Sequence, residues 1–142
     1  MYIKQLSIFI ENKAGRLEDM LGILKDNGIN LVSLSLADTS DYGVLRLLVS
    51  DPENGKAALK AAGVSCKTTD VLAVKLAHKV GQLQELLEVI CKAGINIEYM
   101  YALATGKDDA SIVIKPSDIA RAEELLKGAG VEFVTQEELA NI

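Results

Sequence analysis

The chain has 142 residues, of which 49% are hydrophobic, 25% charged and 4% aromatic, so its composition is that of a soluble globular protein with an aliphatic core. Its net charge of −5 and its pI near 4.9 argue against nucleic acid as a partner, because phosphate binding needs clustered Lys and Arg. The sequence has neither a signal-peptide pattern nor an apolar run approaching the roughly 20 residues that span a membrane, so we expect a cytoplasmic protein without membrane partners.

The first half of the chain predicts the order strand, helix, strand, strand, helix, strand. Apolar residues alternate in the first strand, and a stripe at helical spacing from Leu17 to Leu24 marks the first helix. Asp51 before Pro52 is typical of a helix start. The expected elements are a strand at 6–10, a helix from 17 to 27, strands at 29–37 and 44–49, a helix from 52 to about 62 and a strand at 64–68.

The second half repeats this pattern 66 residues later, with Gly81 in the place of Gly15 and Asn96 in the place of Asn30. The expected elements are a strand at 71–77, a helix from 83 to 93, strands at 95–104 and 111–115, a helix from 118 to 128, a strand at 131–134 and a helical turn after the capping-box pattern at 135–138. The repeat predicts an α+β protein of two ferredoxin-like βαββαβ units, residues 1–69 and 70–142, which we expect to pack together.

Cysteine and histidine are too few to predict a metal site. Cys66 and Cys91 stand apart, with no CxxC pair, and His78 is the one histidine. We therefore expect two buried, reduced thiols, no disulfide, no metal and no cofactor.

The loop that leads from the first strand into the first helix is the strongest candidate site. Unpaired N–H groups and the helix dipole at such a point favour an α-carboxylate, and Gly15 has no side chain to obstruct it. Asn12 and Asn30 carry amides that can bind ammonium and carboxylate groups alike. The alternative is that Gly and Asn serve only a tight turn, and that His78 and the basic loop residues are simply solvated.

The run Asn12-Lys13-Ala14-Gly15-Arg16-Leu17, followed after a helix by Gly28-Ile29-Asn30, resembles the signature of ACT domains, which regulate amino-acid metabolism by binding small effectors, usually amino acids. The resemblance covers almost the whole chain, once per half. In the second half, His78 stands where Asn12 stands, and Val80 stands where the family often has Pro. The resemblance implies a ligand-binding set of Asn12, Lys13, Ala14, Gly15, Arg16, Leu17, Asn30, His78, Val80, Gly81, Gln82, Leu83 and Asn96.

The resemblance also implies that two such units lie side by side through their second strands and bind effectors where they meet. We therefore expect Asn12 to share one site with Asn96, and His78 to share another with Asn30. Exposed strand edges leave pairing between chains, as in a homodimer, open as well.

The sequence has no catalytic constellation, so we expect a non-enzymatic sensor that binds an amino acid and acts through an enzyme or a regulatory protein. One alternative is the regulatory subunit of a biosynthetic enzyme, similar to the small subunit of acetohydroxyacid synthase. A second is an RNA-binding ferredoxin-like module, although the expected central strands lack an aromatic platform. An acylphosphatase-type enzyme shares the order of elements, but residues 13–17 contain no evident nucleophile or base.

Overall fold

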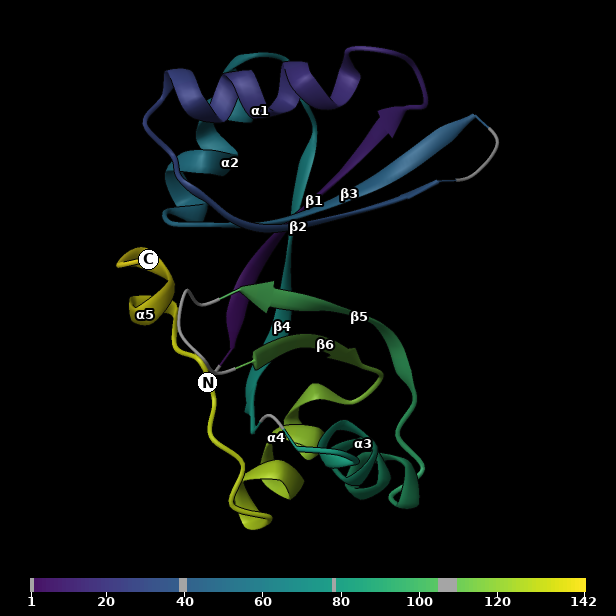
Figure 1. Cartoon of the computed structure of the whole chain (residues 1–142). Helices are drawn as coiled ribbons and strands as arrows, with labels where there is room; N and C mark the ends of the chain where they lie inside the picture. The colour runs from purple at the N-terminus through teal and green to yellow at the C-terminus, as the bar shows by residue number, and fades with distance from the viewer. Residues whose placement is uncertain (1, 39–40, 78, 105–109) are drawn as a thin grey trace. The chain divides into compact units, whose positions relative to one another are not determined.

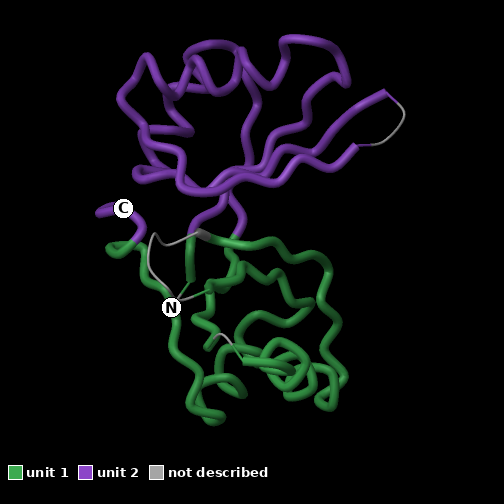
Figure 2. The backbone as a smooth tube through the Cα atoms, in the orientation of Figure 1, with its two compact units in different colours: residues 1–3, 70–138 green, residues 4–69, 139–142 purple. Residues whose placement is uncertain are grey.

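The structure, a computed structural model, describes residues 2–38, 41–77, 79–104 and 110–142 (Figure 1). The chain forms two compact units, which are coloured separately in Figure 2. Unit 2 consists of residues 4–69 with 139–142, and unit 1 consists of residues 1–3 with 70–138. Each unit therefore contains one half of the sequence repeat together with a short segment from the opposite end of the chain.

Unit 2 has the ferredoxin-like arrangement expected for the first half. Its strand order is β2-β3-β1-β4, its antiparallel β1–β3 and β2–β3 pairs are regular apart from one shift in β2, and its two helices pack together on one side of the strands (Figure 1). The elements are β1 (Ile3–Glu11), α1 (Arg16–Asp26), β2 (Leu31–Asp38), β3 (Tyr42–Val49), α2 (Pro52–Ala61) and the start of β4 (Cys66–Leu76).

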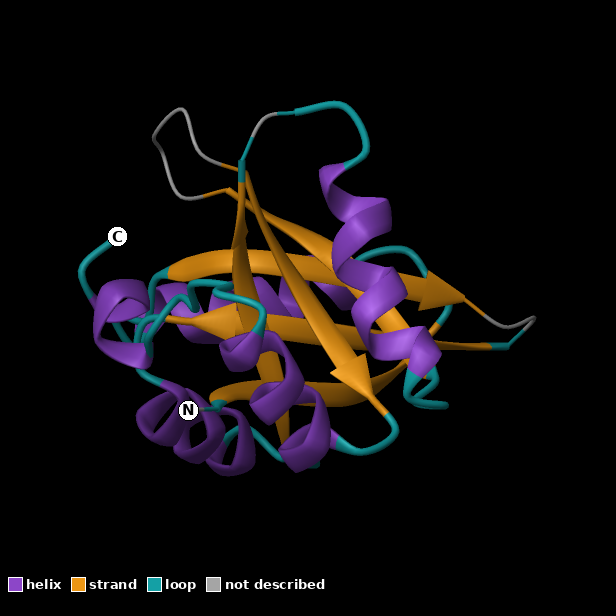
Figure 3. Cartoon of the chain, turned by 90° about the horizontal axis from the view of Figure 1, so that it is seen from below, coloured by secondary structure: helices purple, strands orange, loops and turns teal. Residues whose placement is uncertain are grey.

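Unit 1 repeats this arrangement with the strand order β4-β6-β5, all antiparallel. Its helices α3 and α4 pack against each other. Figure 3 shows the helices of the chain in purple and the strands in orange. The elements are the rest of β4, α3 (Gln82–Lys92), β5 (Ile97–Ala104), β6 (Ala110–Pro116), α4 (Ile119–Gly128) and α5 (Gln136–Ala140). The α+β class with two ferredoxin-like units is confirmed.

Each unit has its own aliphatic core between one face of its strands and its helices. In unit 2, alternate residues of β1 face the helices, while Phe9 on the opposite face is 81% exposed. The helix stripes predicted from Leu17 and from Leu83 supply the other side of each core, through Met20 and Leu24 in unit 2 and Leu86 and Ile90 in unit 1. The strand-side residues include Leu6, Ile8, Leu45 and Leu47 in unit 2 and Leu72, Val74 and Ile114 in unit 1.

Two strand predictions need correction. The strands expected at 64–68 and 71–77 are parts of one continuous strand, β4, so Thr69 and Asp70, which lay between the two expected strands, are inside it. Residues 131–134 form only a single bridge, between Phe133 and Val74. Val131 still closes the end of α4 through a bond to Leu126, and Thr135 already caps α5, so little chain is left to extend the ladder.

The prediction of two buried thiols is also wrong, since Cys91 is exposed and Cys66 only half-buried. Cys91 lies on the flank of α3 that faces away from the core residues Leu86 and Ile90. Among the described residues, no group of three or more His, Cys, Asp and Glu side chains could hold a metal ion. In the same residues, no helix is long and apolar enough to cross a membrane.

Candidate functional site

The two strand-to-helix loops have the same backbone geometry, although their side chains differ. In both loops the glycine that precedes the helix is left-handed, with φ of 86° at Gly15 and 82° at Gly81. The same three main-chain hydrogen bonds occur in both loops. In the first loop they run from Lys13 N to Glu11 O (2.9 Å), from Arg16 N to Lys13 O (3.3 Å) and from Asp19 N to Gly15 O (2.9 Å). Their counterparts in the second loop run from Lys79 N to Ala77 O (2.8 Å), from Gln82 N to Lys79 O (3.3 Å) and from Glu85 N to Gly81 O (3.0 Å).

This geometry leaves polar groups available at the start of each helix. Neither Gly15 nor Gly81 provides a side-chain cap. The N–H groups of Arg16 and Gln82 bond within their loops, so the N–H groups after them in the first helical turn are the ones left for solvent or a ligand. A Cβ at either glycine would meet no atom within 4 Å, so the left-handed backbone, rather than crowding, favours glycine there. Residues 12–16 are exposed and Leu17 is half-buried.

The charges of the first loop are paired with one another. Lys13 Nζ lies 2.9 Å from Glu11 Oε2, Arg16 lies 3.9 Å from the same carboxylate, and Arg16 also lies 3.8 Å from Asp19. The hydrogen bond and charge of Lys13, followed by the charge of Arg16, hold the pKa of Glu11 below its ordinary value. The charges of Lys13 and Arg16 are thus partly balanced by carboxylates of the loop and of α1.

The second loop lacks this network. Ala77 replaces Glu11 and Gln82 replaces Arg16, while Lys79 is exposed and forms no ion pair within the described part of the chain. Val80 is fully exposed, and the prediction for His78 falls on a residue outside the described ones. Of the basic residues in the first loop, only Lys13 therefore has a counterpart in the second.

Asn30 and Asn96 lie in the same backbone frame at the starts of β2 and β5. The main-chain N–H of each asparagine donates to a serine hydroxyl oxygen 3.0 Å away, that of Ser50 for Asn30 and that of Ser117 for Asn96. Each serine N–H in turn donates to the asparagine carbonyl, at 2.9 and 2.8 Å. The side chains differ, because Asn30 Nδ2 donates to the Ile142 carbonyl at 3.1 Å, whereas the Asn96 amide has no partner among the described residues.

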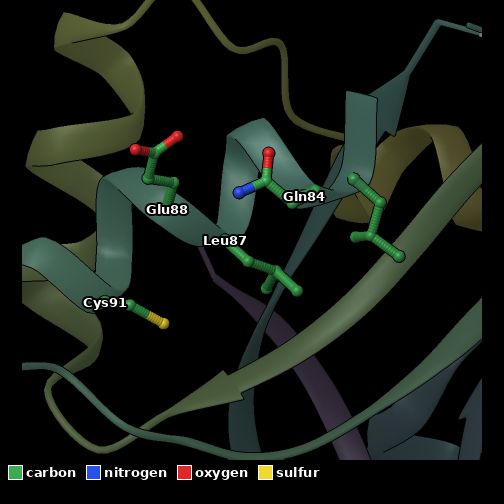
Figure 4. A pocket seen from close by; sticks show the side chains of 5 residues that line it. Gln84, Leu87, Glu88 and Cys91 are labelled. Atoms are coloured by element: carbon green, nitrogen blue, oxygen red, sulfur yellow. The ribbon is translucent and has the colours of Figure 1, made fainter. Parts of the chain in front are cut away.

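Among the residues that the structure describes, surface pockets touch the predicted set at three places, each within one unit. Asn30 lines a pocket of about 380 Å³ with the end of α1, and Gln82 lines one of about 320 Å³ beside the turn at Gly130. Leu83 lines the third, of about 450 Å³, on the exposed flank of α3 (Figure 4). The figure shows Gln84, Leu87, Glu88 and Cys91 projecting from successive turns of that helix.

The comparisons with known proteins now identify the family. The model of the ACT domain pair matches residues 1–142. The chain belongs to the ACT domain pair family. A comparison with curated proteins gave no match.

Several solved structures resemble this ACT domain pair. Protein BT0572 from Bacteroides thetaiotaomicron is 37% identical, with a TM-score of 0.93 over 100% of this chain and 98% of that one. The regulatory subunit of aspartate kinase from Thermus thermophilus, in its ligand-free form, is 16% identical, with a TM-score of 0.62 over 91% of both chains. The corresponding subunit from Thermus flavus is 20% identical, with a TM-score of 0.61 over 89% and 90%. The two latter likenesses concern the fold.

Within one unit of the ACT domain pair, the predicted site residues do not all meet. Asn12 precedes α1 and Asn30 follows it, so these two amides flank a helix of 11 residues, which is roughly 16 Å long. The loop at Gly81 and Asn96 flank α3 in the same way. Within a single ACT unit, the predicted residues thus lie in two separate groups, one at each end of its first helix.

Sequence reasoning did not identify three residues that contact Asn30 or Asn96. Ser50 and Ser117 fix the main chain of the two asparagines, and each directly precedes the aspartate that caps the next helix. That repeated Ser-Asp pair is a signal that was available in the sequence. The contact from Ile142 had no such signal, because it joins residues 112 positions apart.

Proposed function

We propose that this ACT domain pair is a non-enzymatic regulatory protein that binds a free amino acid where two ACT units meet. ACT domains are regulatory rather than catalytic, and the family binds amino-acid effectors. The observation that carries the proposal is the duplicated loop, in which a left-handed glycine leads into an uncapped helix N-terminus that suits an α-carboxylate.

The proposed ligand set includes both loops and both asparagines, with the division between ACT units at residues 69 and 70. Asn12 and Asn96 are exposed, and neither side-chain amide has a partner among the described residues. An amide oxygen can accept from an ammonium group while the amide nitrogen donates to a carboxylate. Asn12 from one unit and Asn96 from the other would then bind the two ends of one amino acid.

A second proposed site combines Asn30 with the loop that contains His78. Its contacts differ in kind, because Val80 is apolar and fully exposed, and Gln82 replaces the arginine of the first loop. We therefore expect weaker binding of the α-carboxylate at this loop than at the loop of Asn12.

The strand edges suggest how two ACT units meet. β2 ends the strand order of unit 2, and β5 ends that of unit 1, so each leaves one edge without a strand of its own unit. Edge strands of this kind pair readily with another strand. Either the other unit or a second copy of the chain, in a homodimer, would complete the site.

A thermal-shift screen of the twenty amino acids tests this function. A ligand at one hundred times its dissociation constant should stabilise the protein by about 2.7 kcal/mol. Calorimetry on the amino acid that binds should then show weaker binding for both Asn12→Ala and Asn96→Ala. The matched control is Asn27→Ala, because Asn27 is exposed and its side-chain amide bonds, within the described residues, to the end of its own helix at Ile23 O. If none of the twenty amino acids raises the unfolding temperature, the proposal is contradicted.

A second candidate is the regulatory subunit of an amino-acid biosynthetic enzyme in the cytoplasm. This chain is similar in fold to two regulatory subunits of aspartate kinase over most of their length. That similarity favours a catalytic enzyme chain as the partner. Purification of the tagged chain together with a catalytic chain, and release or activation of that chain by the same amino acid, would support it. A catalytic chain whose activity does not respond to this protein would exclude it.

A further inference from the structure

The last residues of the chain are attached to unit 2. Leu139 to Ile142, here called the tail segment, belong to unit 2 although residues 70–138 before them belong to unit 1 (Figure 2). Leu139 is completely buried, and Ile142 N–H bonds back to Leu139 O at 3.4 Å. In contrast, the Ile142 side chain is 45% exposed, so the tail segment is held firmly at its start and loosely at its end.

The loosely held end of the tail segment forms a hydrogen bond with the side chain of one of the two equivalent asparagines, Asn30. The Ile142 carbonyl oxygen accepts from Asn30 Nδ2 at 3.1 Å, next to the pocket formed by Asn30 with the end of α1. Asn96 has the same serine-bound backbone but no partner for its amide within the described residues. The difference between the two positions therefore comes from the tail segment and not from the repeat.

We propose that the tail segment is an intramolecular competitor for the effector at Asn30. A carbonyl oxygen that accepts from the Asn30 amide stands where a carboxylate oxygen of an amino acid would accept. Effector binding at Asn30 must then displace the end of the tail segment, whereas binding at Asn96 need not. This inference rests on the proposed function, since it concerns the same ligand class.

The expected size of the effect follows from the bond that is exchanged. A hydrogen bond at an exposed position contributes little net free energy, which corresponds to roughly a three- to tenfold change in affinity. The tail segment therefore raises the effector concentration needed to fill the site at Asn30, and it leaves the affinity of the site at Asn96 unchanged.

Calorimetry with each of the twenty amino acids on variants of the 142-residue chain tests the competitor. Leu139→Ala removes the buried anchor, and we expect it to tighten binding at the Asn30 site roughly three- to tenfold. Leu139→Met is the matched control, because it fills a similar volume and should leave the affinity unchanged. Combining Leu139→Ala with Asn30→Ala should abolish the gain, and combining it with Asn96→Ala should preserve it.

A readout without ligand separates this inference from the proposed function. In ¹⁵N NMR spectra, the side-chain amide of Asn30 should shift and exchange faster with solvent in Leu139→Ala, while that of Asn96 stays the same. A chain that lacks Asn141 and Ile142 keeps the anchor and should behave like Leu139→Ala. Amino-acid binding with unchanged affinity in both variants would overturn the competitor alone. A failure of every amino acid to bind would overturn the competitor and the proposed function together.

Discussion

Lys13 and Glu11 form the shortest ion pair of the first loop, with 2.9 Å between Nζ and Oε2, and the pair lowers the pKa of Glu11. We predict that Lys13→Met raises the pKa of Glu11 toward its ordinary value, because the strongest donor and charge are removed. A carboxyl group with a lowered folded-state pKa stabilises the fold above its unfolded-state pKa. That stabilisation is lost as the pH falls through the folded-state pKa. An NMR titration of the Glu11 carboxyl group measures the shift directly.

The control for this titration lies on α3. Glu88 and Lys92 form a comparable pair at 2.8 Å, and the hydrogen bond and charge of Lys92 lower the pKa of Glu88. Lys92→Met should raise the pKa of Glu88 and leave that of Glu11 unchanged, and the reverse should hold for Lys13→Met. If the pKa of Glu11 is the same in Lys13→Met as in the native chain, the ion pair does not persist in solution, where exposed pairs are weak.

Replacement of Gly15 by alanine should destabilise unit 2 by about 1–2 kcal/mol. The cost comes from the φ of 86°, which an L-residue avoids, and not from crowding, because a Cβ there meets nothing within 4 Å. Gly81→Ala should have a similar effect through its φ of 82°. Thermal or denaturant unfolding gives the change in free energy.

Gly22→Ala provides the opposite result in the same helix. Gly22 lies within α1, and its added Cβ also meets nothing within 4 Å. Alanine in a helix interior is favoured over glycine, so this variant should be more stable by about 0.5–1 kcal/mol. Equal effects of Gly15→Ala and Gly22→Ala would contradict the assignment of a left-handed conformation to Gly15.

These glycines also explain why much of the fold was predictable from the sequence. Gly15 and Gly81 have local signals, a strand pattern before them and a helical stripe after them, and both helices begin one residue later. The helix stripe at Leu86 and Ile90 was predictable for the same reason, since burial of one face follows from spacing. The two ferredoxin-like units follow from these local features repeated at a fixed offset.

The features that escaped prediction depend on contacts distant in sequence. The single bridge at Phe133 depends on how much chain remains between the end of α4 and the cap of α5. The occupation of Asn30 by Ile142 depends on where the tail segment packs, which no periodicity encodes. The pairing of Asn12 with Asn96 is of this kind as well and stays a prediction.

The N-caps of the second helix in each unit should both contribute to stability. Asp51 accepts from Asn54 N–H, and Asp118 accepts from Arg121 N–H, both at 3.1 Å. Asp51→Ala and Asp118→Ala should each cost about 1 kcal/mol, because one N–H of the first turn loses its partner. Asp51→Asn and Asp118→Asn retain an acceptor and should cost clearly less. Urea unfolding curves of the four variants make the comparison.

The two cysteines should react with a thiol reagent such as DTNB at different rates. Cys91 is exposed on α3, whereas Cys66 is half-buried at the start of β4. Burial raises the pKa of the Cys66 thiol, which outweighs the opposing effect of Lys56, so less of the reactive thiolate is present near pH 8. We predict a fast and a slow phase, with the slow phase accelerating as the pH rises toward the pKa of Cys66.

Substitutions assign the phases. Cys91→Ser should remove the fast phase and Cys66→Ser the slow one, with little change in the rate that remains. A slow phase that persists in Cys66→Ser, or two equal rates in the native chain, would contradict the burial of Cys66. The result also bears on the α3 pocket, because a bound molecule that covers Leu87 and Glu88 should protect Cys91 and leave the rate at Cys66 unchanged.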